Sequence, residues 1–289
     1  MKSGLLEQRA RKGYYAVDID TDVMGLGARI VNMIEILSYC DIKKYIPVFK
    51  FSYREKVNED YFGELFSYKN LPVSILMTLQ FTKIRDTSDL KWKNYDKKLS
   101  LTIAKDLFDK YFSFNQAILD EMDSFVRKWF LGKHVLGIHY RGSDKITEAP
   151  CVPLESLHKH VIEILEKEPS INLIFISSDE TAVIHSLMSL QLPVSVVCRQ
   201  DAIRSENGKQ IHLQRQNSKT VINRDAIVNC LLLSKCNYLL KTASLLSDCS
   251  VIFNPTLKVL VLNAPYEHVT WWPTSEINKM ENWHNVTIS

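Results

Sequence analysis

The sequence lacks the long apolar runs of a membrane protein. No stretch approaches the roughly 18 consecutive apolar residues that a membrane-spanning helix needs, and residues 1–20 hold no continuous apolar segment like that of a secretory signal peptide. We therefore expect a cytoplasmic protein without an integral membrane segment. A peripheral association with a membrane stays open.

The chain also lacks a strong excess of charge. Its 289 residues carry a formal net charge of +3 at pH 7, with 24% charged and 46% hydrophobic residues. Proteins that wrap nucleic acid concentrate positive charge on their surface, so we expect no nucleic-acid partner. The composition is that of an ordinary globular protein, and the length suits two modest domains or one large one.

Several motifs of common enzyme classes are missing as well. The six cysteines form no CxxC pair, and no histidine pair has zinc-finger spacing. Most cysteines lie in apolar contexts, so we expect buried free thiols in a reducing compartment. The sequence has neither a GxxxxGK[ST] loop nor a GxSxG elbow, which argues against a P-loop NTPase and an α/β-hydrolase.

Strand-like and helix-like patterns alternate in the C-terminal part of the chain. Strands are predicted for HVLGIHYR, INLIFISS, PVSVVCR, NYLLK and LKVLVLN, and helical spacing lies between them, for example in NRDAIVNCLLLSK. A long polar loop is predicted for residues 200–220. This alternation predicts a parallel sheet covered by helices on both faces. We expect a Rossmann-like α/β lobe over residues 116–289.

The N-terminal part shows one similar unit. The segment YYAVDID predicts a strand, a glycine-containing turn follows, and a helix is expected from about Ala28, with YIPVFKF as the next strand. Residues 52–100 show no clear pattern, and residues 103–130 predict one or two helices. We expect residues 1–115 to form a second, reduced α/β lobe.

Polar side chains follow the predicted C-terminal strands where each strand ends. Arg141 follows the first strand, Ser177 and Asp179 end the second, and Thr242 and Ser244 follow NYLLK. The carboxyl ends of parallel strands share one edge, where ligands bind. Arginine suits phosphate, and a helix that begins at Ser244 would favour an anion. The pattern predicts a site for a phosphorylated, hydroxyl-rich ligand such as a nucleotide sugar.

Each of these residues also has a purely structural interpretation. Arg141 can pair with Asp144 at the surface, and Asp179 can simply cap the helix that follows it. His139, two residues before Arg141, can be a packed core histidine. The sequence leaves these alternatives open.

Four segments carry a resemblance to a known superfamily. GIHYRGSDKITEAP, residues 137–150, resembles the first signature of the α-1,6-fucosyltransferase and NodZ-like superfamily, which shares motifs with protein O-fucosyltransferases. IFISSDE and IVNCLLLSKCNYLLKTAS resemble its second and third motifs, in the family's order. MGLGARIVNMIEIL, residues 24–37, resembles the glycine-rich loop and helix that open its N-terminal lobe.

This resemblance implies a GT-B architecture of two Rossmann-like lobes and an inverting, metal-independent transfer of a sugar, usually from GDP-fucose, to a glycan or glycolipid acceptor. It implies no cofactor besides the donor substrate. Glu148 matches the proposed general base, Arg141 would neutralise the leaving diphosphate, and Lys145 would orient Glu148 or contact the acceptor. The candidate substrate-binding residues are His139, Asp144, Asp179, Asn229, Thr242, Ser244, Gly25 and Gly27.

The sequence departs from the family pattern at three positions. Gly142 stands where α-1,6-fucosyltransferases have a second arginine, Asn229 where the third motif often has aspartate, and Leu245 where a second serine is usual. A nucleotide- or sugar-binding module that has lost turnover is therefore one alternative. A metal-dependent glycosyltransferase is another, because residues 18–22, DIDTD, contain an Asp-x-Asp pattern. A dinucleotide-binding oxidoreductase fits less well, since Gly25-x-Gly27 lacks the third glycine.

Overall fold

The computed structural model describes residues 13–22, 24–53, 59–71, 78–84, 99–142, 147–205 and 218–280. The chain divides into two compact units, Met1–Ile118 and Leu119–Ser289; our predicted division lay between residues 115 and 116. Two of the candidate residues, Asp144 and Lys145, lie outside the described residues. No helix in the described ranges combines the length and apolar character that crossing a bilayer requires.

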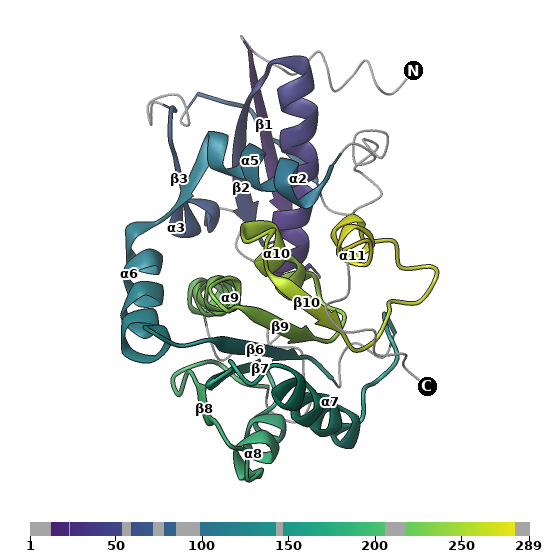
Figure 1. Cartoon of the computed structure of the whole chain (residues 1–289). Coiled ribbons are helices and arrows are strands. Elements are labelled where there is room, and N and C mark those ends of the chain that lie inside the picture. The colour runs from purple at the N-terminus through teal and green to yellow at the C-terminus, as the bar shows by residue number, and fades with distance from the viewer. Residues whose placement is uncertain are drawn as a thin grey trace. The chain divides into compact units, whose positions relative to one another are not determined.

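A parallel sheet forms the centre of the second unit (Figure 1). Its described strands follow the order β10-β9-β6-β7-β8, and all neighbours are parallel. Every residue of β6 is buried, as expected for a strand covered on both faces. The predicted α/β fold is confirmed.

Helix α6 contains the boundary between the two units. From α6 onward the elements are α6 (Gln116–Phe125), the π-helical turn η3 (Val126–Phe130), β6 (Val135–Tyr140), α7 (Leu154–Lys167), β7 (Leu173–Ser178), α8 (Thr181–Ser189), β8 (Ser195–Cys198), α9 (Lys219–Ser234), β9 (Tyr238–Lys241), α10 (Leu245–Phe253), β10 (Lys258–Val261) and α11 (Trp272–Ile277).

Helices cover both faces of this sheet, α7 and α8 on one side and α9 and α10 on the other (Figure 1). Side chains alternate along a strand, so Ile138 and Tyr140 face the core that α7 and α8 complete. Gly137 lies next to Ile138 on β6 and faces the opposite side of the sheet. A Cβ added there would lie 2.9 Å from Sγ of Cys236 and 3.2 Å from Cδ2 of Leu233. The absence of a side chain at Gly137 therefore lets α9 and the turn after it pack closely on β6.

The first unit holds the βαβ arrangement that the sequence predicts. Its described strands form a parallel sheet in the order β2-β1-β4. The helix between β1 and β2 begins at Leu26, two residues before the expected Ala28, with Gly25 as its N-cap. The elements are β1 (Tyr14–Asp20), α2 (Leu26–Lys43), β2 (Ile46–Ser52), α3 (Phe62–Leu65), β3 (Phe66–Tyr68), β4 (Thr82–Ile84), α5 (Leu101–Tyr111) and β5 (Phe112–Phe114).

The predicted helical segment of residues 103–130 is interrupted by a strand. Phe112–Phe114 forms β5 and pairs antiparallel with β3. This pairing buries Phe66 and Phe112, and the ring of Phe112 lies 5.2 Å from that of Phe62 and 5.9 Å from that of Phe49. Packing of these rings outweighs the local helical pattern, an effect that single-segment periodicity does not include.

The cysteines are free thiols, as expected, and five of the six are buried. The exception is Cys151, which is exposed.

Arg29 of α2 joins the carboxyl ends of β1 and β2. Its side chain is completely buried, and Nη1 donates to the carbonyl oxygens of Ile19 at 2.7 Å and Ser52 at 3.2 Å. Nη2 donates to the carbonyl oxygen of Thr21, and the guanidinium carbon lies 4.2 Å from the ring centre of Tyr53. One side chain thus satisfies backbone acceptors from two strands and the turn after β1.

Replacing Arg29 with methionine is expected to lower the free energy of unfolding by about 3 kcal/mol or more, because it removes the hydrogen bonds that the guanidinium donates to buried backbone carbonyls. Urea unfolding followed by circular dichroism measures this loss. The exposed Lys43→Met on the same helix is the control and is expected to change stability by less than about 0.5 kcal/mol. Equal effects of the two substitutions would show that the Arg29 contacts do not stabilise the unit.

Candidate functional site

The structure brings three predicted site residues together at the carboxyl edge of the second unit's sheet. The backbone N–H of Arg141 donates to Oγ1 of Thr242 at 2.9 Å, and that hydroxyl donates to the carbonyl oxygen of Arg141 at 3.2 Å. Nε of Arg141 lies 3.7 Å from Oδ2 of Asp179. The ends of β9, β6 and β7 therefore present a hydroxyl, a guanidinium and a carboxylate side by side.

Asp179 is not the helix cap that the sequence suggested. The N-cap of α8 is Glu180, and its side chain makes no capping hydrogen bond. The backbone carbonyl of Asp179 accepts a hydrogen bond from the N–H of Ser205 at 2.6 Å. Its carboxylate lies next to Arg141. The alternative pairing of Arg141 with Asp144 falls outside the described residues.

Ser244 begins α10, as predicted, without capping it. Its side chain makes no capping hydrogen bond, although it is buried and only 1% exposed. Within the ranges that the structure describes, Oγ has no hydrogen-bond partner. A buried hydroxyl without a partner costs free energy, and a ligand oxygen at the start of α10 would satisfy it.

His139 is buried next to two cations. Burial lowers the pKa of its imidazole to about 3, and the positive charges of Lys241 and Arg141 act in the same direction. The ring is therefore neutral at physiological pH. Its Nδ1 is buried and makes no hydrogen bond to any described residue. The burial fits a core histidine, whereas the unsatisfied nitrogen at this edge fits a ligand contact.

Two buried cations at the same edge escaped the sequence analysis. Lys241 pairs with His139 across β9 and β6, and His139 pairs with Ser177 across β6 and β7. Arg199 directly follows β8. Lys241 is 0% exposed and Arg199 is 6% exposed. The rule that singled out Arg141, a charged residue at the end of an apolar strand, also applies to NYLLK and VVCR and would have found both.

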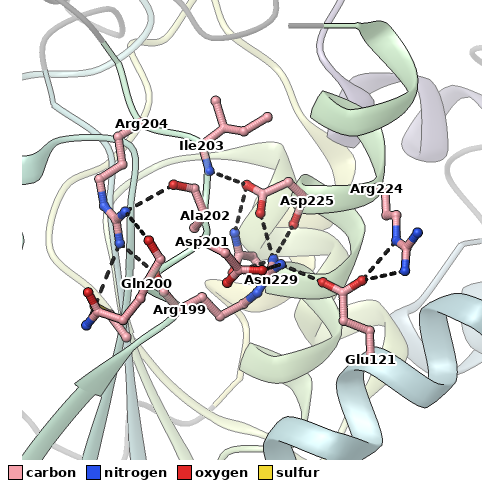
Figure 2. Close-up of polar contacts among 11 residues, drawn as sticks. Glu121, Arg199, Gln200, Asp201, Ala202, Ile203, Arg204, Arg224, Asp225 and Asn229 are labelled. Carbon is pink, nitrogen blue, oxygen red and sulfur yellow. Dashed lines mark hydrogen bonds and ion pairs between the residues drawn. The ribbon is translucent and has the colours of Figure 1, made fainter.

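Arg199 is the centre of a polar network that includes the candidate residue Asn229 (Figure 2). Nη1 donates to Oδ1 of Asp225 at 2.7 Å and Nη2 to Oε1 of Glu121 at 2.5 Å. Asn229 contributes Oδ1, 3.5 Å from Nη1, and its Nδ2 donates to Asp225 at 3.3 Å. Both polar groups of Asn229 therefore contact protein partners.

The carboxylate of Glu180 lies close to Gly142, the residue after Arg141. An added Cβ at Gly142 would lie 2.6 Å from Oε1 of Glu180 and 2.9 Å from Cε1 of Tyr140. A larger residue there would have to displace Glu180. A second arginine at this position, as in α-1,6-fucosyltransferases, would therefore require the side chains of Glu180 and Tyr140 to shift.

The segment that carries Glu148 is tied to the start of α10 through one asparagine. Asn263 donates to the carbonyl oxygen of Pro150 at 2.6 Å and accepts from the N–H of Ala243 at 2.7 Å. The carbonyl oxygen of Glu148 itself accepts from the N–H of Tyr266 at 2.9 Å. These bonds hold the half-buried Glu148 near the same edge as Thr242.

The glycine-rich turn and the Asp-x-Asp segment lie in the first unit. Gly25 has φ −68°, which any residue adopts, so its backbone does not require glycine; close approach to a ligand stays a prediction for Gly25 and Gly27. Asp18 accepts from Oγ of Ser52 at 2.7 Å, and Asp20 pairs with Lys83 at 3.1 Å. Within the described ranges, no cluster of acidic, histidine or cysteine side chains has the arrangement of a metal site.

Asp225 is expected to make stability depend on pH. Burial raises the pKa of its carboxyl to about 6, although Arg199 lowers it. The folded state therefore takes up a proton that the unfolded state does not, so the contribution of Asp225 to stability is full at low pH and declines as pH rises through about 6. The stability difference between wild type and Asp225→Asn is expected to favour wild type more at pH 5 than at pH 7, by about 1 kcal/mol. Urea unfolding at both pH values measures it, and a constant difference would contradict the prediction.

No protein-family model and no curated protein matches the sequence. Solved fucosyltransferase structures do match. A NodZ α-1,6-fucosyltransferase soaked with GDP-fucose is 14% identical, with a TM-score of 0.53 over 83% of this chain and 93% of that chain. NodZ from Bradyrhizobium is 12% identical, with a TM-score of 0.54 over 86% and 96%. A mutant of Arabidopsis thaliana FUT1 in complex with GDP is 12% identical, with a TM-score of 0.56 over 94% and 76%.

At these identities the likeness concerns the fold. It confirms the predicted α/β class with parallel sheets, and the fold is the one that the resemblance of the motifs implies. The chain has the GT-B-type fold of the NodZ and plant fucosyltransferases.

Proposed function

We propose that the protein is an inverting glycosyltransferase that moves a sugar, fucose from GDP-fucose being the first candidate, to a hydroxyl of a glycan or glycolipid. One observation carries the proposal. The carboxyl edge of the second unit's sheet gathers the guanidinium of Arg141, the hydroxyl of Thr242 and the unsatisfied Oγ of Ser244 at the start of α10. This combination suits a diphosphate.

The chemistry needs positive charge at the leaving group. The acceptor oxygen attacks the anomeric carbon, the bond from that carbon to the β-phosphate oxygen breaks, and the diphosphate leaves with the bonding electrons. Arg141 and the N–H groups at the start of α10 would stabilise the charge that develops on this oxygen. His139, kept neutral by burial and by Lys241 and Arg141, would donate or accept a hydrogen bond without adding charge.

The proton of the acceptor hydroxyl must also leave as the new bond forms. A carboxylate within hydrogen-bond reach can take it as general base, and Glu148 is the residue that we assign to this step. Its segment is tied to Ala243 through Asn263, which supports this assignment. Lys145 follows Arg141 in sequence and would orient Glu148 or contact the acceptor, and Asp144 would bind substrate.

A second candidate function is nucleotide binding without transfer. Gly142 and Asn229 favour it, because both depart from the pattern of the fucosyltransferases, and Asn229 is already engaged in the Arg199 network. A protein that binds a nucleoside diphosphate but yields no glycoside with any acceptor supports this function. A transfer activity that EDTA abolishes would instead support the metal-dependent Asp-x-Asp alternative.

Replacing Arg141 with alanine is expected to weaken nucleoside-diphosphate binding at least about tenfold, since it removes charged hydrogen bonds to phosphate. The measurement is a thermal-shift panel with GDP, UDP, ADP, GDP-fucose and GDP-mannose. We expect GDP and GDP-fucose to raise the melting temperature of wild type selectively, and Arg141→Ala to lose this rise. The exposed Arg127→Ala is the matched control. Unchanged GDP binding in Arg141→Ala would refute the role of Arg141.

Replacing Glu148 with glutamine is expected to leave the GDP-induced thermal shift intact and to lower the transfer rate by about 10²–10⁴-fold, the usual contribution of a general base. Release of GDP in the presence of acceptor measures the rate. Glu155→Gln, at the exposed start of α7, serves as the control. A Glu148→Gln enzyme with the wild-type rate would show that another group takes the proton.

A further inference from the structure

A buried ion pair encloses the segment Thr242–Ser244. Nζ of Lys241, the last residue of β9, lies 2.8 Å from Oδ1 of Asp248 in α10, and both side chains are 0% exposed. Oδ2 of Asp248 accepts a hydrogen bond from Oγ1 of Thr274 in α11 at 2.5 Å. The N–H of Asp248 also donates to the carbonyl oxygen of Ser244 at 3.0 Å. The network thus joins β9, α10 and α11 around the start of α10.

Stability alone does not explain this pair. Removing two charges from water costs several kcal/mol per ion, and a well-packed apolar pair of similar volume is often as stable or more stable. Both elements also bury apolar side chains, namely Leu239 in β9 and Val251 and Ile252 in α10, so apolar residues are compatible with this part of the unit. The retained charges therefore need another explanation.

The position of Asp248 provides one. It lies in the first turn of α10, where a carboxylate suits the helix dipole but opposes any anion bound at the same end. The start of α10 is also where the buried Oγ of Ser244 has no hydrogen-bond partner among the described residues. An anion there would meet the charge of Asp248 unless a cation cancelled it. Lys241 is that cation.

We propose that Lys241 is an electrostatic positioning residue, whose ammonium cancels the charge of Asp248 so that the start of α10 can hold the diphosphate of the donor. Asp248 anchors α10 to α11 through Thr274, and Lys241 lets it do so without repelling the ligand. Neither side chain touches the donor. This inference rests on the proposed function, because it assumes a diphosphate at Ser244.

The two halves of the pair should act in opposite directions on binding. Lys241→Met leaves the charge of Asp248 next to the diphosphate, so we expect the affinity for GDP to fall about tenfold or more. Asp248→Asn removes the repelling charge, so we expect GDP to bind as tightly as to wild type or more tightly. The double variant, which has neither charge, should bind GDP within about threefold of wild type.

Isothermal titration with GDP and with guanosine tests this. Guanosine has no phosphate, so its affinity should stay within about twofold of wild type in all three variants. Ile252→Val, a buried uncharged change in α10, is the control: it should lower the melting temperature without changing the ratio of the two affinities. A merely structural ion pair predicts instead that both single variants weaken GDP and guanosine alike, and this result would overturn the proposal.

Other outcomes also decide between the two proposals. Should Lys241→Met fail to fold, Asp248→Asn alone is decisive, since weaker GDP binding in that variant contradicts the electrostatic role. Wild-type protein that does not bind GDP refutes the proposed donor site itself. Wild-type protein that binds GDP, together with variants that lose GDP and guanosine equally, refutes only the role of Lys241.

Discussion

The pairing of β6 with β9 is the constraint on which the candidate site depends. It joins the backbone of Arg141 to the hydroxyl of Thr242, two residues 101 positions apart in the chain. Because the strands are parallel, the chain must cross over between them through helices, and every strand then ends at the same edge. The side chains that follow the strands therefore collect there, whatever their distance in sequence.

That edge places several charges in an environment with little water, and almost every one is matched. Lys241 pairs with Asp248, and Arg199 pairs with Asp225 and Glu121. The distance from nitrogen to carboxylate oxygen is within hydrogen-bond range in each pair. A buried charge without a partner would be costly, so the sheet can carry this many cations only because α6, α9 and α10 supply carboxylates. The helices thus do more than cover the apolar face, since their carboxylates also set the electrostatic potential at the edge where we propose that the donor binds.

The sequence predicts the strands well because fully buried parallel strands are continuous apolar runs. INLIFISS and NYLLK need no tertiary information, and Arg141, Thr242 and Ser244 follow from the rule that strand ends carry function. β5 was missed because a three-residue strand is stabilised by rings from distant segments such as Phe62 and Phe49. Asp179 was misassigned as a cap because only the fold brings the guanidinium of Arg141 to it.

Lys241, Arg199 and Arg141 differ in their distances to the carboxylates next to them. Lys241 and Arg199 make hydrogen bonds of 2.8 and 2.7 Å to carboxylates, so turning either toward a ligand would break a short, buried bond. Nε of Arg141 lies 3.7 Å from Asp179, beyond the range of a good hydrogen bond. Carboxylates of the same unit therefore fix Lys241 and Arg199 in place, and Arg141, whose Nε lies farther from Asp179, is the cation that we assign to the phosphate.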